Sequence, residues 1–296
     1  MLRSVAIRKI RPYLYLVPSL VFLAIFTYFP ILYSLYLSFF KQNILHPQPV
    51  FAGLANYVDV FDEKLFFTVV KNTFFYAVTS IPVTMGLALV LAIFLNEKLG
   101  WVRNIYRVVA FYPTMIPMAA AGMLAVWLFN PGIGLVNFYL KKFFGVSTIE
   151  WLYDMKWALP AIVITSIWKN FGYFMLIYLA GLQNISGELY ESADLEGCGF
   201  LQRLRYITLP LLRPTTMFVI IVGLISSFQV FDLVYTMTQG GPADSSNVIV
   251  YYIYQYAFRF WNIGHASALT VLFVSALLIF IVFLVRTVER RVHYEV

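Results

Sequence analysis

Long apolar runs alternate with short polar segments along this chain. Six of the runs reach the roughly 20 residues that a helix needs to cross a bilayer core about 30 Å thick. They cover residues 13–40, 70–95, 106–129, 157–182, 215–237 and 266–285. Because backbone groups find no water partner in lipid, each run is predicted to be a transmembrane helix. The fold class that follows is an all-α, polytopic membrane protein.

The composition agrees with this pattern and excludes several classes of protein. Hydrophobic residues make up 61% of the chain and charged residues only 12%, whereas ordinary globular domains carry about 45–50% and about 25%. The single cysteine, Cys198, has no partner for an internal disulfide. The histidines are scattered without the spacing of a metal site, so we expect no metal. A soluble enzyme, a disordered tail and a secreted disulfide scaffold are excluded.

Basic residues set the expected orientation. Arg3, Arg8, Lys9 and Arg11 precede the first run, which is too long for a signal peptide and ends without a small-residue cleavage site. We therefore expect an uncleaved anchor. With the N-terminus and C-terminus in the cytoplasm, most of the 21 lysines and arginines lie in cytoplasmic segments, as the positive-inside rule requires. The net charge of +7 is thus shared among membrane flanks, which argues against nucleic-acid binding.

We expect two parts within the chain. Residues 1–69 hold the N-terminal cytoplasmic segment, the first transmembrane helix and an outer loop, and residues 70–290 hold a core of five transmembrane helices. Within the core, residues 183–213 form a long cytoplasmic loop. On the outer side, residues 239–242 read Gln-Gly-Gly-Pro, a strong helix breaker. The Tyr- and Phe-rich residues 248–260 are expected to form a helix at the outer surface.

The cytoplasmic loop has the pattern of two short helices. Ser186 is a suitable N-cap, and Glu188 and Glu191 lie in the first turns, where the helix dipole favours acids. Gly197 and Gly199 then interrupt the helix, and residues 200–207 are predicted to form a second, basic helix.

The first of these loop helices carries an apolar strip beside its acidic residues, made of Leu189, Tyr190, Ala193 and Leu195. One interpretation is a solvated connector. The other is a docking helix, which would insert into a cleft of a soluble partner. A rigid docked helix would transmit the partner's motion to the spans attached at either end.

A spaced motif in this loop resembles the EAA loop of ABC-importer permeases. The family pattern is Glu-Ala-Ala, three residues, Gly, nine residues and Ile-x-Leu-Pro. This chain has Glu191-Ser192-Ala193, Gly197 and Ile207-x-Leu209-Pro210 at those spacings. The departures, Ser192 among them, are small or conservative. Residues 179–185, 231–233 and 238–242 are also similar to the carbohydrate-uptake branch of these permeases, which includes maltose-importer and glycerol-3-phosphate permeases.

The resemblance implies the fold of type I ABC-importer permeases and a set of partners. These are a second, homologous permease in a heterodimer, two copies of an ABC ATPase subunit, an extracytoplasmic substrate-binding protein and the lipid bilayer. The membrane would be the cytoplasmic (inner) membrane of a bacterium or archaeon. ATP and Mg²⁺ would belong to the ATPase subunits, because this chain has no G-x-x-x-x-G-K-[ST] phosphate loop. The chain itself is therefore not expected to be an enzyme.

The same resemblance implies an ATPase-docking surface on the cytoplasmic loop. Glu191 would pair with a basic residue of the ATPase cleft, Ala193 would permit close packing, and Gly197 would make the turn between the two helices. The full expected set is Glu188, Leu189, Tyr190, Glu191, Ser192, Ala193, Gly197 and Pro210.

Two charged residues lie within predicted spans, where charges are costly and usually face the bundle interior. Lys169 is near the middle of the fourth span, and Asp232 is in the outer half of the fifth. Gln229 and Asp232 are three residues apart and can share a helix face. The candidate substrate pathway comprises these residues and their polar or aromatic neighbours, namely Trp168, Lys169, Asn170, Tyr173, Gln229, Asp232 and Tyr235.

This candidate pathway has a functional and a structural interpretation. Carboxylate and amide groups would bind sugar hydroxyls, aromatic rings would stack on sugar faces, and Lys169 would bind a phosphate. Alternatively, Lys169 and Asp232 form a structural pair, or Asp232 caps a backbone break near Gly240.

The predicted function is a permease subunit of an ATP-driven ABC importer that moves a sugar, an oligosaccharide or glycerol-3-phosphate by alternating access. Residues 289–294 resemble the C-terminal ends of glycerol-3-phosphate permeases. The alternative is a secondary transporter or channel that is independent of an ATPase. Such a protein would need coupling-ion carboxylates at the midplane and usually an internal repeat, neither of which is evident. A membrane enzyme would need a clustered acid, base or metal set.

Overall fold

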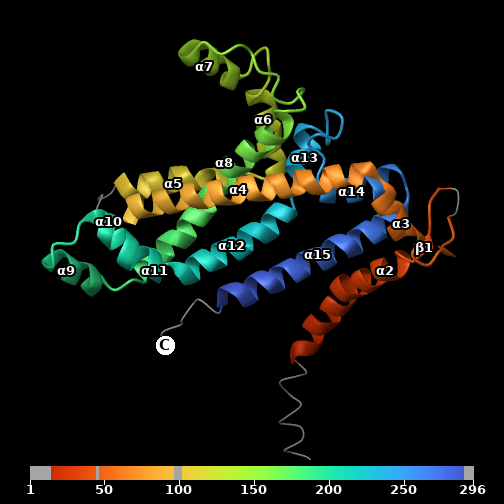
Figure 1. Ribbon diagram of the computed structural model, residues 1–296, viewed down its shortest axis with the longest axis horizontal. Coiled ribbons are helices and arrows are strands. Elements are labelled where there is room, and N and C mark those ends of the chain that lie inside the picture. The colour runs from red at the N-terminus through yellow and green to blue at the C-terminus, as the bar shows by residue number, and fades with distance from the viewer. Residues whose placement is uncertain (1–14, 45–46, 97–101, 290–296) are drawn as a thin grey trace, which may run out of the picture. The chain divides into compact units, whose positions relative to one another are not determined.

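A computed structural model of the chain describes residues 15–44, 47–96 and 102–289. Helices dominate these ranges (Figure 1). The basic residues Arg3, Arg8, Lys9 and Arg11 lie outside the described residues, and so does the C-terminal segment 290–296. The predicted orientation and the resemblance of the C-terminal tail therefore stay predictions.

The elements follow one another with short connections. The α-helices are α2 (Phe29–Leu37), α3 (Ala55–Asp62), α4 (Lys64–Asn96), α5 (Val102–Met115), α6 (Met118–Leu128), α7 (Leu135–Phe144), α8 (Ala158–Gln183), α9 (Gly187–Leu195), α10 (Phe200–Arg203), α11 (Leu209–Leu211), α12 (Arg213–Phe228), α13 (Asp232–Met237), α14 (Ile249–Tyr254) and α15 (Ile263–Glu289). The wider π-helical turns are η1 (Ala24–Tyr28), η2 (Leu204–Thr208) and η3 (Gln255–Arg259). Two short antiparallel strands, β1 (Phe40–Lys41) and β2 (Val50–Phe51), pair in the first outer loop.

The predicted spans are present, although two of them are not straight. Among the described residues, the helices long and apolar enough to cross a membrane unbroken are Tyr15–Leu37, Lys64–Asn96, Ala158–Gln183 and Ile263–Leu284. They correspond to the first, second, fourth and sixth predicted spans. Two further candidates are helix pairs bent at a short break, by 98° between α5 and α6 and by 64° before α12. Up to six spans result if each bent pair is one span.

The third predicted span, residues 106–129, is wrong as a continuous helix. α5 ends at Met115, and α6 begins only at Met118. Pro117 has no N–H, so it cannot donate to the carbonyl of Pro113. The N–H of Ile116 donates to that carbonyl instead, at 3.2 Å. The tightened turn ends α5 and allows the sharp bend.

The fifth predicted span, residues 215–237, is wrong at its C-terminal end, because α12 stops at Phe228 and α13 begins at Asp232. The structure before its N-terminal end also differs from expectation. Helical structure continues from α10 through η2 to α11, so the second loop helix is longer than the predicted residues 200–207. The bend before α12 lies beside Pro214, which cannot donate to the carbonyl of Pro210.

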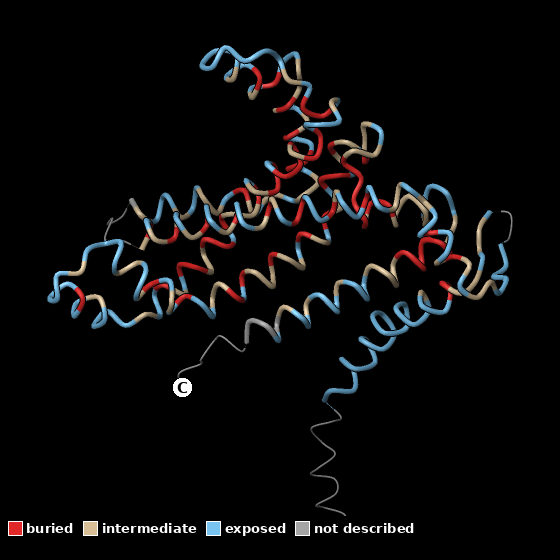
Figure 2. Tube along the Cα trace, viewed as in Figure 1, coloured by how far each residue is buried: buried red, intermediate tan, exposed pale blue. Residues whose placement is uncertain are grey.

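The described chain forms two compact units. One contains residues up to Lys64 together with Ile253–Leu278, and the other contains Leu65–Tyr252 together with α15 from Ile279 onward. In the larger unit, α8 is the most buried of the long helices, as Figure 2 shows.

Small residues let the helices of the larger unit pack closely around α8. Met175 and Tyr178 of α8 join Ala88 and Ala92 of α4 and Val219 of α12 in one buried apolar cluster. The small side chains of the α4 alanines leave room in this cluster for the larger side chains of α8.

A glycine sets the approach of α5 to α8. A Cβ at Gly172 would collide with the backbone carbonyl oxygen of Ala110. Only a residue without a side chain therefore allows these two backbones to come so close.

The loop after α13 is fixed to α4. The side-chain amide of Asn72 donates to the carbonyl oxygens of Asp244 and Asn247, at 3.0 Å each. The hydroxyl of Thr73 accepts from the N–H of Ile249 at 2.9 Å. The loop then leads into α14 and η3, which confirms the helix predicted within residues 248–260.

The smaller unit combines an exposed helix with a polar cluster. In the first span, Tyr15–Leu37, the apolar side chains are exposed almost all round, so lipid or protein must cover them. Around Glu63, the Tyr256 hydroxyl donates to the carboxylate at 2.7 Å, and the buried His265 ring stacks on Tyr256 with centroids 4.1 Å apart.

Candidate functional site

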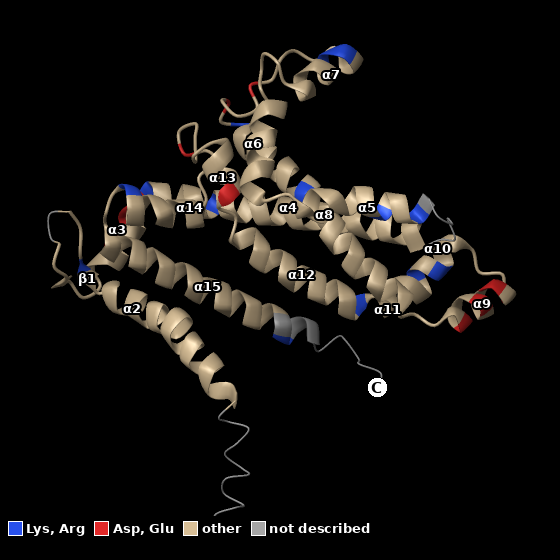
Figure 3. Ribbon diagram, turned by 180° about the vertical axis from the view of Figure 1, so that it is seen from behind, with Lys and Arg blue, Asp and Glu red and all other residues tan. Residues whose placement is uncertain are grey.

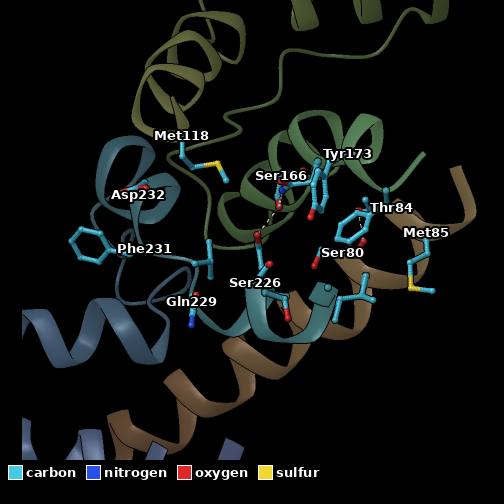
Figure 4. Close-up of a pocket in the computed structure, with 17 residues that line it drawn as sticks. Ser80, Thr84, Met85, Met118, Ser166, Tyr173, Ser226, Gln229, Phe231 and Asp232 are labelled. Atoms are coloured by element: carbon cyan, nitrogen blue, oxygen red, sulfur yellow. Dashed lines mark hydrogen bonds between the residues drawn. The ribbon is translucent and has the colours of Figure 1, made fainter. Parts of the chain in front are cut away.

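A polar hollow lies among the helices of the larger unit. It has a volume of roughly 200 Å³ and is enclosed by α4, α8, α12 and the start of α13, with Met118 of α6 at its edge (Figure 4). Its lining is mixed, with hydroxyls, amides and one carboxylate among apolar side chains: Tyr76, Ser80, Ile81, Thr84, Met85, Met118, Ser166, Asn170, Tyr173, Phe174, Gly223, Ser226, Ser227, Gln229, Val230, Phe231 and Asp232. An ionisable residue among membrane helices marks a candidate functional site by default, and Asp232 is such a residue in this lining.

The α4 side of the hollow is a stripe that sequence analysis missed. Tyr76, Ser80 and Thr84 are spaced four residues apart, so they share one face of α4. The Tyr76 hydroxyl donates to the Ser166 hydroxyl of α8 at 2.6 Å, and the Thr84 hydroxyl donates to the Ser80 carbonyl at 2.6 Å. The signal was available as a polar repeat of four residues within an apolar run.

The α8 side of the hollow contains two of the predicted residues. Asn170 and Tyr173 line it together with Ser166, and the Asn170 amide donates to the Ser166 carbonyl at 2.9 Å. Their spacing along α8 puts them on the face toward α4 and α12. Trp168, another predicted pathway residue, is 36% exposed and is not part of the lining.

The break after α12 supplies the other predicted residues. Gln229 caps the end of α12 and Asp232 begins α13, and both line the hollow (Figure 4). The prediction that they share a face of one helix is wrong, because residues 229–231 are not helical. Tyr235 stacks on Phe231 with centroids 5.5 Å apart, but it does not reach the hollow itself.

Lys169 precedes the lining residue Asn170 in the sequence, but its side chain does not line the hollow. It binds the backbone at the break in the third span instead. Its side chain is buried, and its ammonium group donates to the carbonyl oxygen of Thr114 at 2.8 Å. In return the Thr114 hydroxyl donates to the Lys169 carbonyl at 3.1 Å. A helix end leaves carbonyls without helical partners, and Lys169 satisfies one of them where α5 stops.

Two structural roles were predicted as alternatives, a Lys169–Asp232 pair and a cap by Asp232 near Gly240, and both are wrong. The Lys169 ammonium group binds a backbone carbonyl rather than the Asp232 carboxylate. Near Gly240, the backbone N–H is bound by the Thr238 hydroxyl at 3.3 Å, so that break is capped without Asp232.

The loop that was predicted to be cytoplasmic forms the expected helix, turn and helix. The Ser186 hydroxyl accepts from the N–H of Glu188 at 3.3 Å, which confirms the predicted N-cap. At the other end of α9, the N–H of Cys198 donates to the Ala193 carbonyl at 2.9 Å and that of Gly197 to the Asp194 carbonyl at 3.1 Å. Gly197 has φ +77°, and this is a Schellman cap with glycine in the left-handed position.

The expected docking residues lie on more than one face of this loop. Glu188, Leu189, Glu191 and Ser192 are exposed, and Figure 3 shows the acidic character of α9. Tyr190, half-buried, places its hydroxyl 3.0 Å from that of Thr208. Two others are inside: Ala193 is buried and Pro210 of α11 is half-buried. The outward acids and Leu189 are thus the groups available to a partner.

The chain is similar to known membrane components of importers. Residues 84–294 match the family described as binding-protein-dependent transport system inner membrane component. The probable ABC transporter permease protein YurN of Bacillus subtilis is 37% identical over 88% of this chain and 90% of the relative. The sn-glycerol-3-phosphate transport system permease protein UgpA of Agrobacterium fabrum is 32% identical over 97% of each chain.

A solved structure agrees with these relatives. A chain in the crystal structure of a bacterial ABC transporter that imports the acidic polysaccharide alginate superposes with a TM-score of 0.85 at 25% identity, covering 98% of both chains. Bent and straight spans around a polar hollow, with a helical hairpin at one end, therefore define a type I ABC-importer permease fold. The chain belongs to the family of binding-protein-dependent transport system inner membrane components, and it is a permease subunit of an ABC importer.

Proposed function

We propose that this permease moves a carbohydrate and that the hollow between α4, α8 and α12 holds the cargo in transit. The observation that carries the proposal is the gathering of hydroxyl and amide side chains in one place among apolar spans. Such groups replace the water bonds of sugar hydroxyls, and Tyr173 offers a ring face. Relatives named for the transport of arabinooligosaccharides and of the polysaccharide alginate support the same chemical class.

The charges of the hollow favour a sugar over a phosphate ester. Its lining contains the carboxylate of Asp232, and neither lysine nor arginine is among the lining residues. Lys169, the cation predicted to bind a phosphate, donates its ammonium hydrogen bond to the carbonyl of Thr114. A phosphate placed here would meet a like charge without a compensating cation, which is costly at low dielectric.

The size of the hollow limits the cargo. At roughly 200 Å³ it is smaller than the about 300–1,000 Å³ of typical ligand pockets. It therefore takes a small sugar or one unit of an oligosaccharide. A longer cargo would extend into space that the second permease completes.

The transport cycle follows from the proposed partners. This chain pairs with a homologous permease in the cytoplasmic membrane, with both termini in the cytoplasm. Two ATPase subunits, which hold ATP and Mg²⁺, dock beneath the two permeases, one of them on α9 of this chain through Glu191 and its neighbours. A substrate-binding protein delivers the sugar outside. ATP-driven closure of the ATPases stabilises the outward-open state, because a partner shifts an equilibrium only by its differential affinity for the two states. This chain hydrolyses no ATP itself.

A pair of threonines on α4 tests the role of the hollow. Thr84 lines it and Thr79 does not, yet both hydroxyls donate to a carbonyl of their own helix at 2.6 Å. Thr84→Ala should weaken sugar-dependent uptake by roughly two- to tenfold, the value of one neutral hydrogen bond. The assembled importer is reconstituted in proteoliposomes with its binding protein, and uptake is measured over a panel of sugars and glycerol-3-phosphate. Equal uptake by Thr84→Ala and Thr79→Ala, with Asn170→Ala also unchanged, would refute the proposed site.

A further inference from the structure

An ion pair closes the cytoplasmic hairpin across its glycine turn. A guanidinium nitrogen of Arg203, at the end of α10, donates to a carboxylate oxygen of Asp194 near the end of α9. The side chains are 30% and 56% exposed, respectively, so both lie at the surface of the loop. Neither position is among the fixed positions of the Glu-Ala-Ala motif, whose acid in this loop is Glu191.

The turn that the ion pair spans has a regular hydrogen-bonded geometry, but two of its residues are glycines without side chains. Gly197 ends α9 in the left-handed conformation, and the N–H of Gly199 is bound by the side chain of Gln202 at 2.8 Å. Glycines allow many backbone angles, so the turn by itself does not hold α9 and α10 at one angle. Contacts between the two arms must do so.

Those contacts are few, and they surround a hollow. Besides Asp194 with Arg203, the hydroxyls of Tyr190 and Thr208 meet at 3.0 Å. Between these two contacts and the end of α4 lies a hollow of roughly 350 Å³ that both charged residues line. Both the ion pair and the hydroxyl pair join a side chain of α9 to the helical stretch that leads into α12, across this hollow.

We propose that the Asp194–Arg203 ion pair is a positioning contact that makes the two arms of the hairpin move as one body. Motion imposed on α9 then reaches α12 through α10, η2 and α11 instead of being absorbed by the glycine turn. The proposal rests on the proposed function, in which α9 is the ATPase-docking helix. It predicts that the pair governs transport per ATP hydrolysed rather than docking itself.

The size of the effect follows from the exposure of the pair. Partly exposed ion pairs contribute little to folding stability, so removing this one should leave the assembled complex intact. Looser coupling between the arms should instead lower the sugar moved per ATP by roughly two- to fivefold, the range that the interaction energy of such a pair allows.

The test is a charge exchange in the complete importer. Asp194→Arg, Arg203→Asp and the double variant are reconstituted with the second permease, the ATPase and the binding protein, and sugar uptake and ATP hydrolysis are measured together. Each single variant should lower uptake per ATP, and the double variant should restore it. The matched control combines Asp194→Arg with Arg205→Asp, which reverses a neighbouring arginine that is not in the pair. This control should not restore coupling.

The outcomes separate this inference from the docking proposal. If Glu191→Arg abolishes ATPase copurification while the exchanged pair fails to restore uptake per ATP, the positioning role is refuted and docking stands. If Glu191→Arg copurifies normally and transports normally, the docking proposal itself is refuted. Unchanged uptake per ATP in both single variants would also overturn the positioning role.

Discussion

Lys169 offers a sharp test of how this permease tolerates a broken span. Lys169→Met keeps most of the apolar stem but removes the ammonium group that binds the carbonyl of Thr114 at 2.8 Å. That carbonyl belongs to the last turn of α5, where the backbone leaves the helix before Pro117. The variant leaves a partly buried acceptor at the break without its ammonium donor.

The expected cost can be worked from that lost contact. A buried acceptor left without a partner costs about 1–3 kcal/mol. For a chain of this size, each kcal/mol corresponds to about 2–4 °C in Tm. The variant should therefore lose heat stability by several degrees.

The measurement is the thermal unfolding midpoint of the purified permease complex, compared with Lys141→Met. Lys141 is exposed on α7, so its substitution should leave the midpoint unchanged. Cargo preference should not change in Lys169→Met, because the ammonium group does not line the hollow. An unshifted midpoint, or a selective loss of anionic cargo, would refute the assignment of Lys169 to the break.

Two glycine substitutions give further predictions. Gly197→Ala should lower ATPase copurification by several-fold, because its φ of +77° costs a side-chain-bearing residue about 1–2 kcal/mol. Gly187→Ala, at the open start of α9, is the control, and equal copurification would contradict the capping role. Gly172→Leu should prevent α5 from packing on α8 and abolish folded permease in the membrane fraction, whereas Gly86→Ala meets open space and should be tolerated. Normal yields of Gly172→Leu would show that the close approach to Ala110 is not required.

The apolar pattern predicted where helices run but not where they bend. Hydropathy reports the polarity of side chains and not the conformation of the backbone. The apolar runs around Pro117 and Gln229 therefore looked continuous, although the backbone leaves the helix there. The short cytoplasmic helices were easier, because the cap at Ser186 and the turn at Gly197 depend on neighbouring residues.

Only part of the candidate site could be predicted from the sequence, for a related reason. Asn170, Tyr173, Gln229 and Asp232 were found from their polarity and proximity, and all line the hollow. The stripe on α4 was missed because serine and threonine are unremarkable in membrane helices, where they bond their own backbone. The partner of Lys169 lies 55 residues away, and no local pattern specifies such a contact.

The loop held by Asn72 has a consequence for how any protein that docks on it would recognise this permease. Two amide hydrogen bonds tie the backbone at Asp244 and Asn247 to α4, so the loop is already shaped before any encounter. Ordering a free backbone costs about 1–2 kcal/mol per residue in conformational entropy. In this loop that entropy is lost when the permease folds, so it is not lost again on binding. A protein that docks here would therefore bind a loop that is already ordered. Asn72, which holds the loop from α4, would affect the binding affinity without contacting that protein.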